Sequence, residues 1–193
     1  ARLEYGAHNH AAVAATYRQL IGLMDVQARR ESTQVEPRKY NRYLGRLVDA
    51  LNLQKQHGEA EQEVRRILLS IRNGGIYSGL KTAPFVERLV VAVLGQAGTI
   101  VAPADLSVGN ATGKRALPAA RLCAKAVAAL ERRTPNPTEA DHYVLGLLTD
   151  QAMTLLKDAL ARGAAKPPDL QSDPDWQVLR FHKNYATLVV PTK

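Results

Sequence analysis

The stretch PRKYNRYLGRLVDALNLQKQ, residues 37 to 56, decides the fold of this chain. It opens with a proline, which suits the first turn of an α-helix. Its apolar residues recur every three or four positions, the spacing of one helix face. These residues are Tyr40, Tyr43, Leu44, Leu47, Val48 and Leu51. The pattern predicts an amphipathic helix from Pro37 to about Gln56.

The same periodicity predicts five further helices in the 193 residues. The six helices are expected over residues 10–30, 37–56, 59–72, 84–95, 117–133 and 137–162. The fourth is apolar on most sides, which predicts that it is the central and most buried helix. For the sixth, Asn136 is predicted as the N-cap, with Pro137 at the first position and Glu139 at the third.

The expected fold class is all-α, because alanine and leucine dominate the apolar residues and only 5% of residues are aromatic. Residues 1–163 are predicted to form a bundle of about six helices, with residues 1–9 as an extended N-terminal arm. Residues 164–193 are predicted as a proline-containing extension that packs on the core or on a neighbouring subunit. Its end, ATLVVPTK, has the composition of a short strand that would pair with a neighbouring subunit's sheet edge.

Composition limits the classes of function. A net charge of +8 suits a polyanionic partner or an acidic membrane surface. Cys123 is the only cysteine, which excludes an intrachain disulfide and a thiolate metal cluster from one chain. No apolar run is long enough to span a bilayer, and the start has no signal-peptide pattern. We therefore expect an intracellular protein, in the cytoplasm or in a virion.

One glycine-containing stretch, GNATGKR, partly matches a phosphate-binding P-loop. The P-loop needs four residues between its glycines, whereas three separate Gly109 from Gly113, and Arg115 stands where a hydroxyl residue should bind magnesium. A looser site for one phosphate beside Lys114 and Arg115 stays open, as does an ordinary surface loop. No other motif meets the spacing of a cofactor, metal or catalytic site, so we predict no cofactor and no enzymatic activity.

The basic residues of the second helix form a stripe opposite its leucines. At about 100° per residue, Arg42 and Arg46 lie about 40° and 80° from Arg38. Lys39 lies at about 100°, at the edge of the stripe. Tyr40 falls on the apolar side and Tyr43 on its border, which favours contacts of the cations with a phosphate backbone over base stacking.

The fifth helix repeats this arrangement. The stretch from Lys114 to Arg133 holds six basic residues and one acid, Glu131. An ordinary exposed helix face usually mixes the two signs of charge, so this bias favours a function. The predicted nucleic-acid contacts in this part of the chain are Lys114, Arg115, Arg121, Lys125 and Arg132.

These features favour a structural protein that packs against copies of itself and holds DNA or RNA by its backbone, as a viral coat or nucleocapsid subunit does. The predicted assembly contacts are Trp176, Phe181, Leu188 and Val189. Two alternatives stay open. One is a helical protein-interaction or adaptor module, and the other is a helical nuclease whose site residues cannot be paired from the sequence.

Overall fold

The computed structural model describes residues 9–31, 36–101 and 115–189. Every regular element within these ranges is a helix, which confirms the all-α prediction. The chain divides into two compact units, one that extends to Gln96 and one that begins at Ala97. From the sequence, residues 1–163 were predicted to form a single helical core. The predicted N-terminal arm lies outside the described residues, apart from Asn9.

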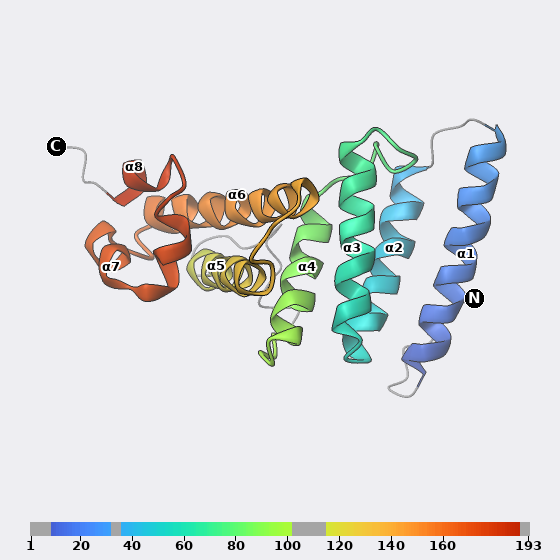
Figure 1. Cartoon of the computed structure of the whole chain (residues 1–193), viewed down its shortest axis with the longest axis horizontal. Helices are drawn as coiled ribbons and strands as arrows, with labels where there is room; N and C mark the ends of the chain where they lie inside the picture. The colour runs from blue at the N-terminus through green and yellow to red at the C-terminus, as the bar shows by residue number, and fades with distance from the viewer. Residues whose placement is uncertain (1–8, 32–35, 102–114, 190–193) are drawn as a thin grey trace. The chain divides into compact units, whose positions relative to one another are not determined.

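The first unit contains four long helices that lie side by side and alternate in direction (Figure 1). They are α1 (His10–Glu31), α2 (Pro37–Leu53), α3 (His57–Arg72) and α4 (Ala83–Gln96). All four were predicted to within a few residues at each end. Within this unit α2 contacts each of the other three helices, so α2 is central and not the predicted fourth helix. The fourth helix, α4, is the most buried one, as predicted, because only Ala83 and Gln96 at its ends are exposed.

The core of this unit follows the apolar spacing of the sequence. On α2, Leu44, Leu47 and Leu51 are buried. Val64 and Ile67 of α3, which contacts α2, are also buried, and α4 adds a further buried stripe. The buried residues of α4 are Phe85, Val86, Leu89, Val90, Ala92, Val93 and Leu94. Burial of these side chains supplies the main driving force for packing the helices.

Polar contacts fix α1 to the rest of the unit. Tyr77, which follows α3, is fully buried and donates its hydroxyl hydrogen bond to the Asp25 carboxylate of α1, with distances of 2.9 and 3.1 Å to the two oxygens. Burial raises the pKa of Tyr77 to about 12, so the hydroxyl remains a donor at neutral pH. At the other end of α1, the Gln54 side chain donates to the His10 carbonyl at 3.0 Å.

The second unit is built on a hairpin of α5 (Ala116–Arg133) and α6 (Glu139–Ala161). The buried face of α5 is composed mostly of alanine, which lets the two helices approach closely. Its buried residues are Ala116, Ala119, Ala120, Cys123, Ala124, Ala126, Val127, Ala129 and Leu130. Both helices were predicted, although the start of α6 differs.

The N-cap of α6 is Thr138, so the prediction of Asn136 was wrong. The Thr138 hydroxyl accepts from the Asp141 amide at 3.2 Å, and the Asp141 carboxylate accepts from the Thr138 amide at 2.9 Å. This reciprocal capping box satisfies two amides, whereas Asn136 would have satisfied one. Pro137 therefore precedes the helix.

The C-terminal extension forms three short helices: α7 (Pro167–Ser172), the 3₁₀ helix η4 (Pro174–Leu179) and α8 (Tyr185–Val189). The predicted strand is therefore wrong as far as Val189, and residues 190–193 lie outside the described chain. Buried Tyr185 donates to the Leu170 carbonyl at 3.1 Å, which holds α8 on α7. This packing outweighs the weak strand preference of the β-branched residues.

Candidate nucleic-acid interface

The predicted cations of α2 lie on its exposed side. Arg38, Lys39, Arg42 and Arg46 are exposed, and we call these four residues the α2 basic face. Lys39 forms an ion pair with Glu36 at 2.7 Å, and hydrogen bonding to that carboxylate raises the pKa of Lys39. The face thus keeps its charge at every physiological pH.

The acid Asp49 shares the side of α2 that carries these arginines, since it lies only about 20° from Arg38 around the helix. It is bound by Arg88 of α4, whose guanidinium donates to both carboxylate oxygens at 2.9 Å. Arg88 also donates to the Gly45 carbonyl at 3.2 Å. A Cβ at Gly45 would lie 2.9 Å from the Arg88 Nη2, so glycine provides the space for this contact. Arg88 thereby neutralises an acid that would otherwise offset the α2 basic face.

Further cations lie at the end of the first unit where α2 begins. Because the helices alternate in direction, this end also holds the last turns of α1 and α3 and the segment that leads into α4. A Cβ at Gly79 in that segment would lie 3.3 Å from the Pro37 Cγ, which confirms that the segment reaches the start of α2. The exposed cations that these elements add are Arg29, Arg30, Arg72 and Lys81. We call these four residues the basic end.

The tyrosines of α2 do not present a stacking surface. Tyr40 is 2% exposed, and its ring packs 5.6 Å from that of Tyr77. Tyr43 is partly buried, and its ring lies 5.8 Å from that of Tyr17 on α1. The aromatic rings therefore contribute to helix packing, and the cations make up the exposed chemistry of α2.

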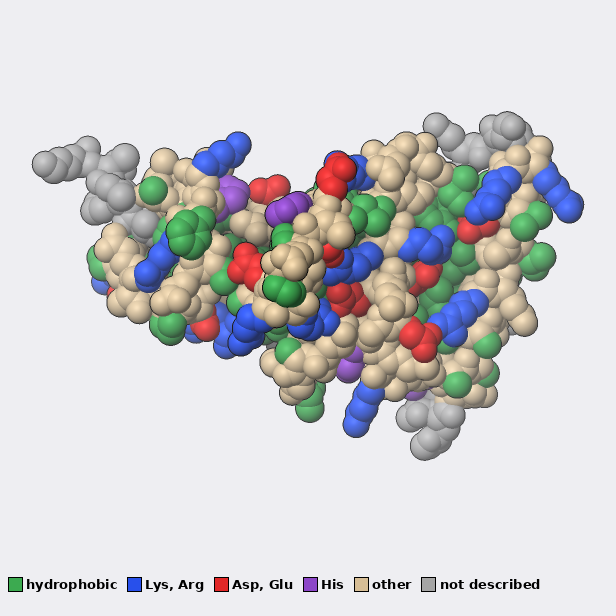
Figure 2. Space-filling model, viewed as in Figure 1, with side chains coloured by type: hydrophobic (Ala, Val, Ile, Leu, Met, Phe, Trp, Pro, Cys, Tyr) green, Lys and Arg blue, Asp and Glu red, His purple; other side chains and the backbone are tan. Residues whose placement is uncertain are grey.

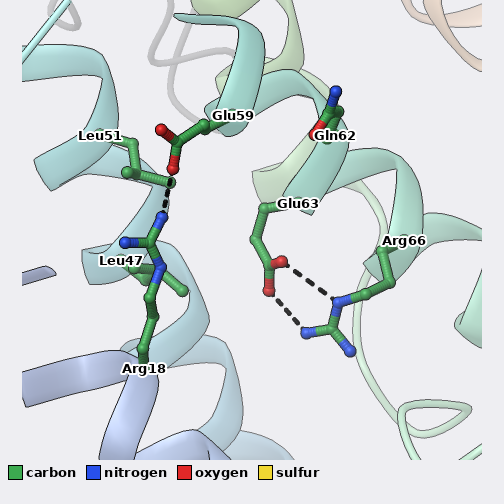
Figure 3. Close-up of a pocket in the computed structure, with 7 residues that line it drawn as sticks. All are labelled: Arg18, Leu47, Leu51, Glu59, Gln62, Glu63 and Arg66. Atoms are coloured by element: carbon green, nitrogen blue, oxygen red, sulfur yellow. Dashed lines mark hydrogen bonds and ion pairs between the residues drawn. The ribbon is translucent and has the colours of Figure 1, made fainter. Parts of the chain in front are cut away.

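A groove of about 260 Å³ lies between α1, α2 and α3, with Leu47 and Leu51 among its lining residues. Across it, Arg18 pairs with Glu59 at 2.5 Å (Figure 3). Farther along α3, Glu63 pairs with Arg66 at 2.6 Å. The positive and negative charges around the groove cancel, so it selects neither an anion nor a cation. Its clearest role is to hold α1 against α3.

The basic ridge of α5 is partly covered by its own chain. Arg121 pairs with Asp173, and with Asp175 at 3.2 Å, while its guanidinium lies 5.8 Å from the centre of the Trp176 ring. Lys125 also reaches Asp175, at 3.5 Å. These acids were not predicted from the sequence. They lie in the segment Asp-Pro-Asp-Trp, residues 173–176, at the start of η4. Two acids that flank a proline beside the lone tryptophan were a signal that could have revealed the contact.

The other predicted cations of this region differ in their environment. Arg115 and Arg132 are exposed, and the Arg132 Nε donates to the Ala128 carbonyl at 3.2 Å. Lys114 and the rest of the predicted phosphate loop lie outside the described residues. The α2 basic face and the basic end therefore form a larger group of exposed cations than the described part of the predicted basic ridge of α5.

The acids that cover α5 predict a pH dependence. Hydrogen bonding from the Asp175 amide, at 2.9 Å, and the nearby Arg121 charge hold the pKa of Asp173 below its usual value. A carboxyl with a lowered folded-state pKa stabilises the protein above its unfolded pKa of about 3.9, and this stability is lost as the pH falls through the folded value. We expect Asp173→Asn to cost on the order of 1 kcal/mol at neutral pH and less in acid.

Denaturant unfolding of the wild type and of Asp173→Asn at neutral pH and near pH 3 measures this difference. Asp169→Asn, which changes an exposed aspartate of α7, is the matched control. A difference between wild type and Asp173→Asn that does not shrink in acid would contradict the role of the Asp173 charge.

The predicted assembly residues divide into two kinds. Trp176 is fully buried in the second unit, where η4 packs on α5. Phe181 is 96% exposed, and Leu188 is partly buried. Val189 ends α8, and its side chain lies outside the described part. Of these residues, Phe181 offers the largest apolar surface to another molecule.

Within the described ranges, no group of three His, Cys, Asp or Glu side chains is placed to hold a metal ion. No described helix is long and apolar enough to cross a membrane. The chain matches no known family model, curated protein or solved structure. The geometry of the exposed cations therefore carries the functional argument.

Proposed function

We propose that the chain is a structural nucleic-acid-binding protein that holds the phosphate backbone on the α2 basic face and the basic end. The observation that carries this proposal is the group of eight exposed cations on neighbouring elements of one unit. Arg88 strengthens it by binding Asp49, an acid of the same side of α2. Clustered lysine and arginine attract polyanions and release their counterions on contact.

Contacts of this kind position a nucleic acid without selecting its sequence. Phosphate contacts carry no direct sequence information, whereas base recognition needs groups that reach base edges or stack on bases. The rings of Tyr40 and Tyr43 are used inside the unit. We therefore expect similar affinities for oligonucleotides of different sequence.

Self-association completes the proposed role as a coat or nucleocapsid-type subunit in a virion or in the cytoplasm. We assign Phe181 to this contact, because its ring is 96% exposed and its burial against another copy would remove apolar surface from water. Size measurement of the purified particle, with its absorbance at 260 nm, tests this part of the proposal. A monomer free of nucleic acid would contradict it and favour an adaptor module.

The binding itself is tested with labelled single-stranded oligonucleotides of two sequences, by fluorescence anisotropy over a series of salt concentrations. With about five phosphate contacts, we expect the logarithm of the affinity to fall with a slope of about −3.5 against the logarithm of the salt concentration. Between 50 and 200 mM salt, this slope corresponds to a loss of about a hundredfold. Absence of binding at low salt, or affinity that is independent of salt, would overturn the proposal.

A further inference from the structure

The outer side of α1 exposes three large aliphatic side chains. Leu23 is 70% exposed, Val26 48% and Leu20 37%. All three lie within about 120° around the last three turns of the helix, so they form one strip. An exposed strip of large aliphatic residues marks a contact surface more often than a scattered single leucine does.

The charged residues of α1 that precede Arg29 are turned away from this strip. Arg18 reaches Glu59 on α3, and Asp25 accepts from the buried Tyr77 hydroxyl. Both lie on the flank of α1 that faces α3. The outer side therefore carries aliphatic, small and uncharged polar residues until the last turn, where Arg29 and Arg30 follow.

Cations frame the strip at its end and on its α2 side. Arg30 falls about 20° from Leu23 around α1, so it continues the strip. Tyr17 packs on Tyr43 in this antiparallel pair, which places Leu20 beside the first turns of α2 and therefore beside the α2 basic face. Figure 2 shows hydrophobic and basic side chains next to one another over α1.

We propose that this strip and its flanking cations dock on a membrane surface that carries anionic headgroups. Aliphatic side chains that enter the headgroup region beside lysine and arginine are the usual chemistry of interfacial attachment. A nucleic acid would cover the cations and leave Leu23 in water. A second copy of the same face would cover Leu23 but bring like charges together. An anionic lipid surface would both remove the aliphatic side chains from water and attract the flanking cations.

The shape of the face agrees with this partner. The strip lies on the side of α1 opposite Arg18 and Asp25, which face α3. The helix α1 is the first of the row of four and packs mainly on α2 (Figure 1). A rigid protein partner would need a complementary groove to receive it, whereas a lipid headgroup layer adapts to a single helix. This contact does not require the binding of nucleic acid, so the two functions can be tested separately.

The test is co-flotation of the full chain with vesicles of phosphatidylcholine alone or with about 30% phosphatidylserine. We expect binding to the anionic vesicles only, and a loss of at least about tenfold for the Leu23→Ser/Val26→Ser variant. The matched control is Leu53→Ser, which removes an aliphatic side chain of similar exposure at the far end of α2. It should bind vesicles like the wild type.

Oligonucleotide binding by the same variants separates the two proposals. The Leu23→Ser/Val26→Ser variant should retain its affinity for oligonucleotides, while reversal of the α2 cations should reduce it. If the wild type does not bind anionic vesicles, or if the double serine variant binds them equally well, the membrane proposal is overturned. Concentration-dependent dimerisation without vesicle binding, abolished by the same variant, would assign the strip to a second copy and also overturn it.

Discussion

Replacement of Arg38, Arg42 and Arg46 together by glutamate is expected to weaken nucleic-acid binding by about a hundredfold to a thousandfold at low salt. Each lost phosphate contact removes about one decade of affinity near 50 mM salt, and the new carboxylates add repulsion. The slope of affinity against salt should become shallower by about 2 to 3. All three side chains are exposed, so the helix should persist in the variant.

The measurement is anisotropy titration of a labelled oligonucleotide, with circular dichroism to verify helicity. A control with Lys157→Glu, Lys166→Glu and Lys183→Glu changes the net charge by the same amount at exposed lysines of the second unit. This control should lose much less affinity than the arginine variant. Equal losses in the two variants would show that the overall charge, and not the α2 basic face, determines binding.

Trp176→Ala is expected to lower the free energy of unfolding by about 3–5 kcal/mol, the range for removal of a large buried aromatic side chain. Trp176 is a fully buried residue of η4, which packs on α5, and Arg121 lies over its ring. The substitution leaves a cavity and removes the cation–π contact. It should also release Asp173 and Asp175 from α5, since η4 holds these acids in position.

Chemical denaturation followed by circular dichroism measures this change. Phe181→Ala provides the control, because Phe181 is almost completely exposed in the same extension and its removal should change stability by less than about 0.5 kcal/mol. Trp176→Phe should fall between the two, since it retains a smaller ring. A loss below about 1 kcal/mol for Trp176→Ala would contradict the role of Trp176 as the anchor of η4.

The long helices α1 to α6 could be predicted from the sequence because their apolar spacing and most of their end signals agree. On α2, for example, a proline at the start and leucines at helical spacing favour the same structure. The same helical spacing, about 100° per residue, predicted that Arg38, Arg42 and Arg46 form one exposed stripe. Local patterns of this kind need no knowledge of the neighbouring helices.

Features that depend on distant residues could not be predicted in this way. The capture of Asp49 by Arg88 joins two helices, and the cover of Arg121 by Asp173 joins residues 52 positions apart. The short helix at Tyr185 depends on its contact with α7, which outweighs local strand preference. The basic end required the alternation of helix directions before Arg72 and Lys81 could be placed beside α2.

The contact of Arg88 with Asp49 would couple the proposed binding of a polyanion to the docking of α4 on α2. If α4 moved away from α2, the Asp49 carboxylate would be released to interact with the arginines beside it, and the positive potential of that surface would fall. If a polyanion binds this surface as proposed, we expect it to bind more tightly when α4 is docked. By thermodynamic linkage, the bound polyanion would then favour the docked position of α4 by the same free energy.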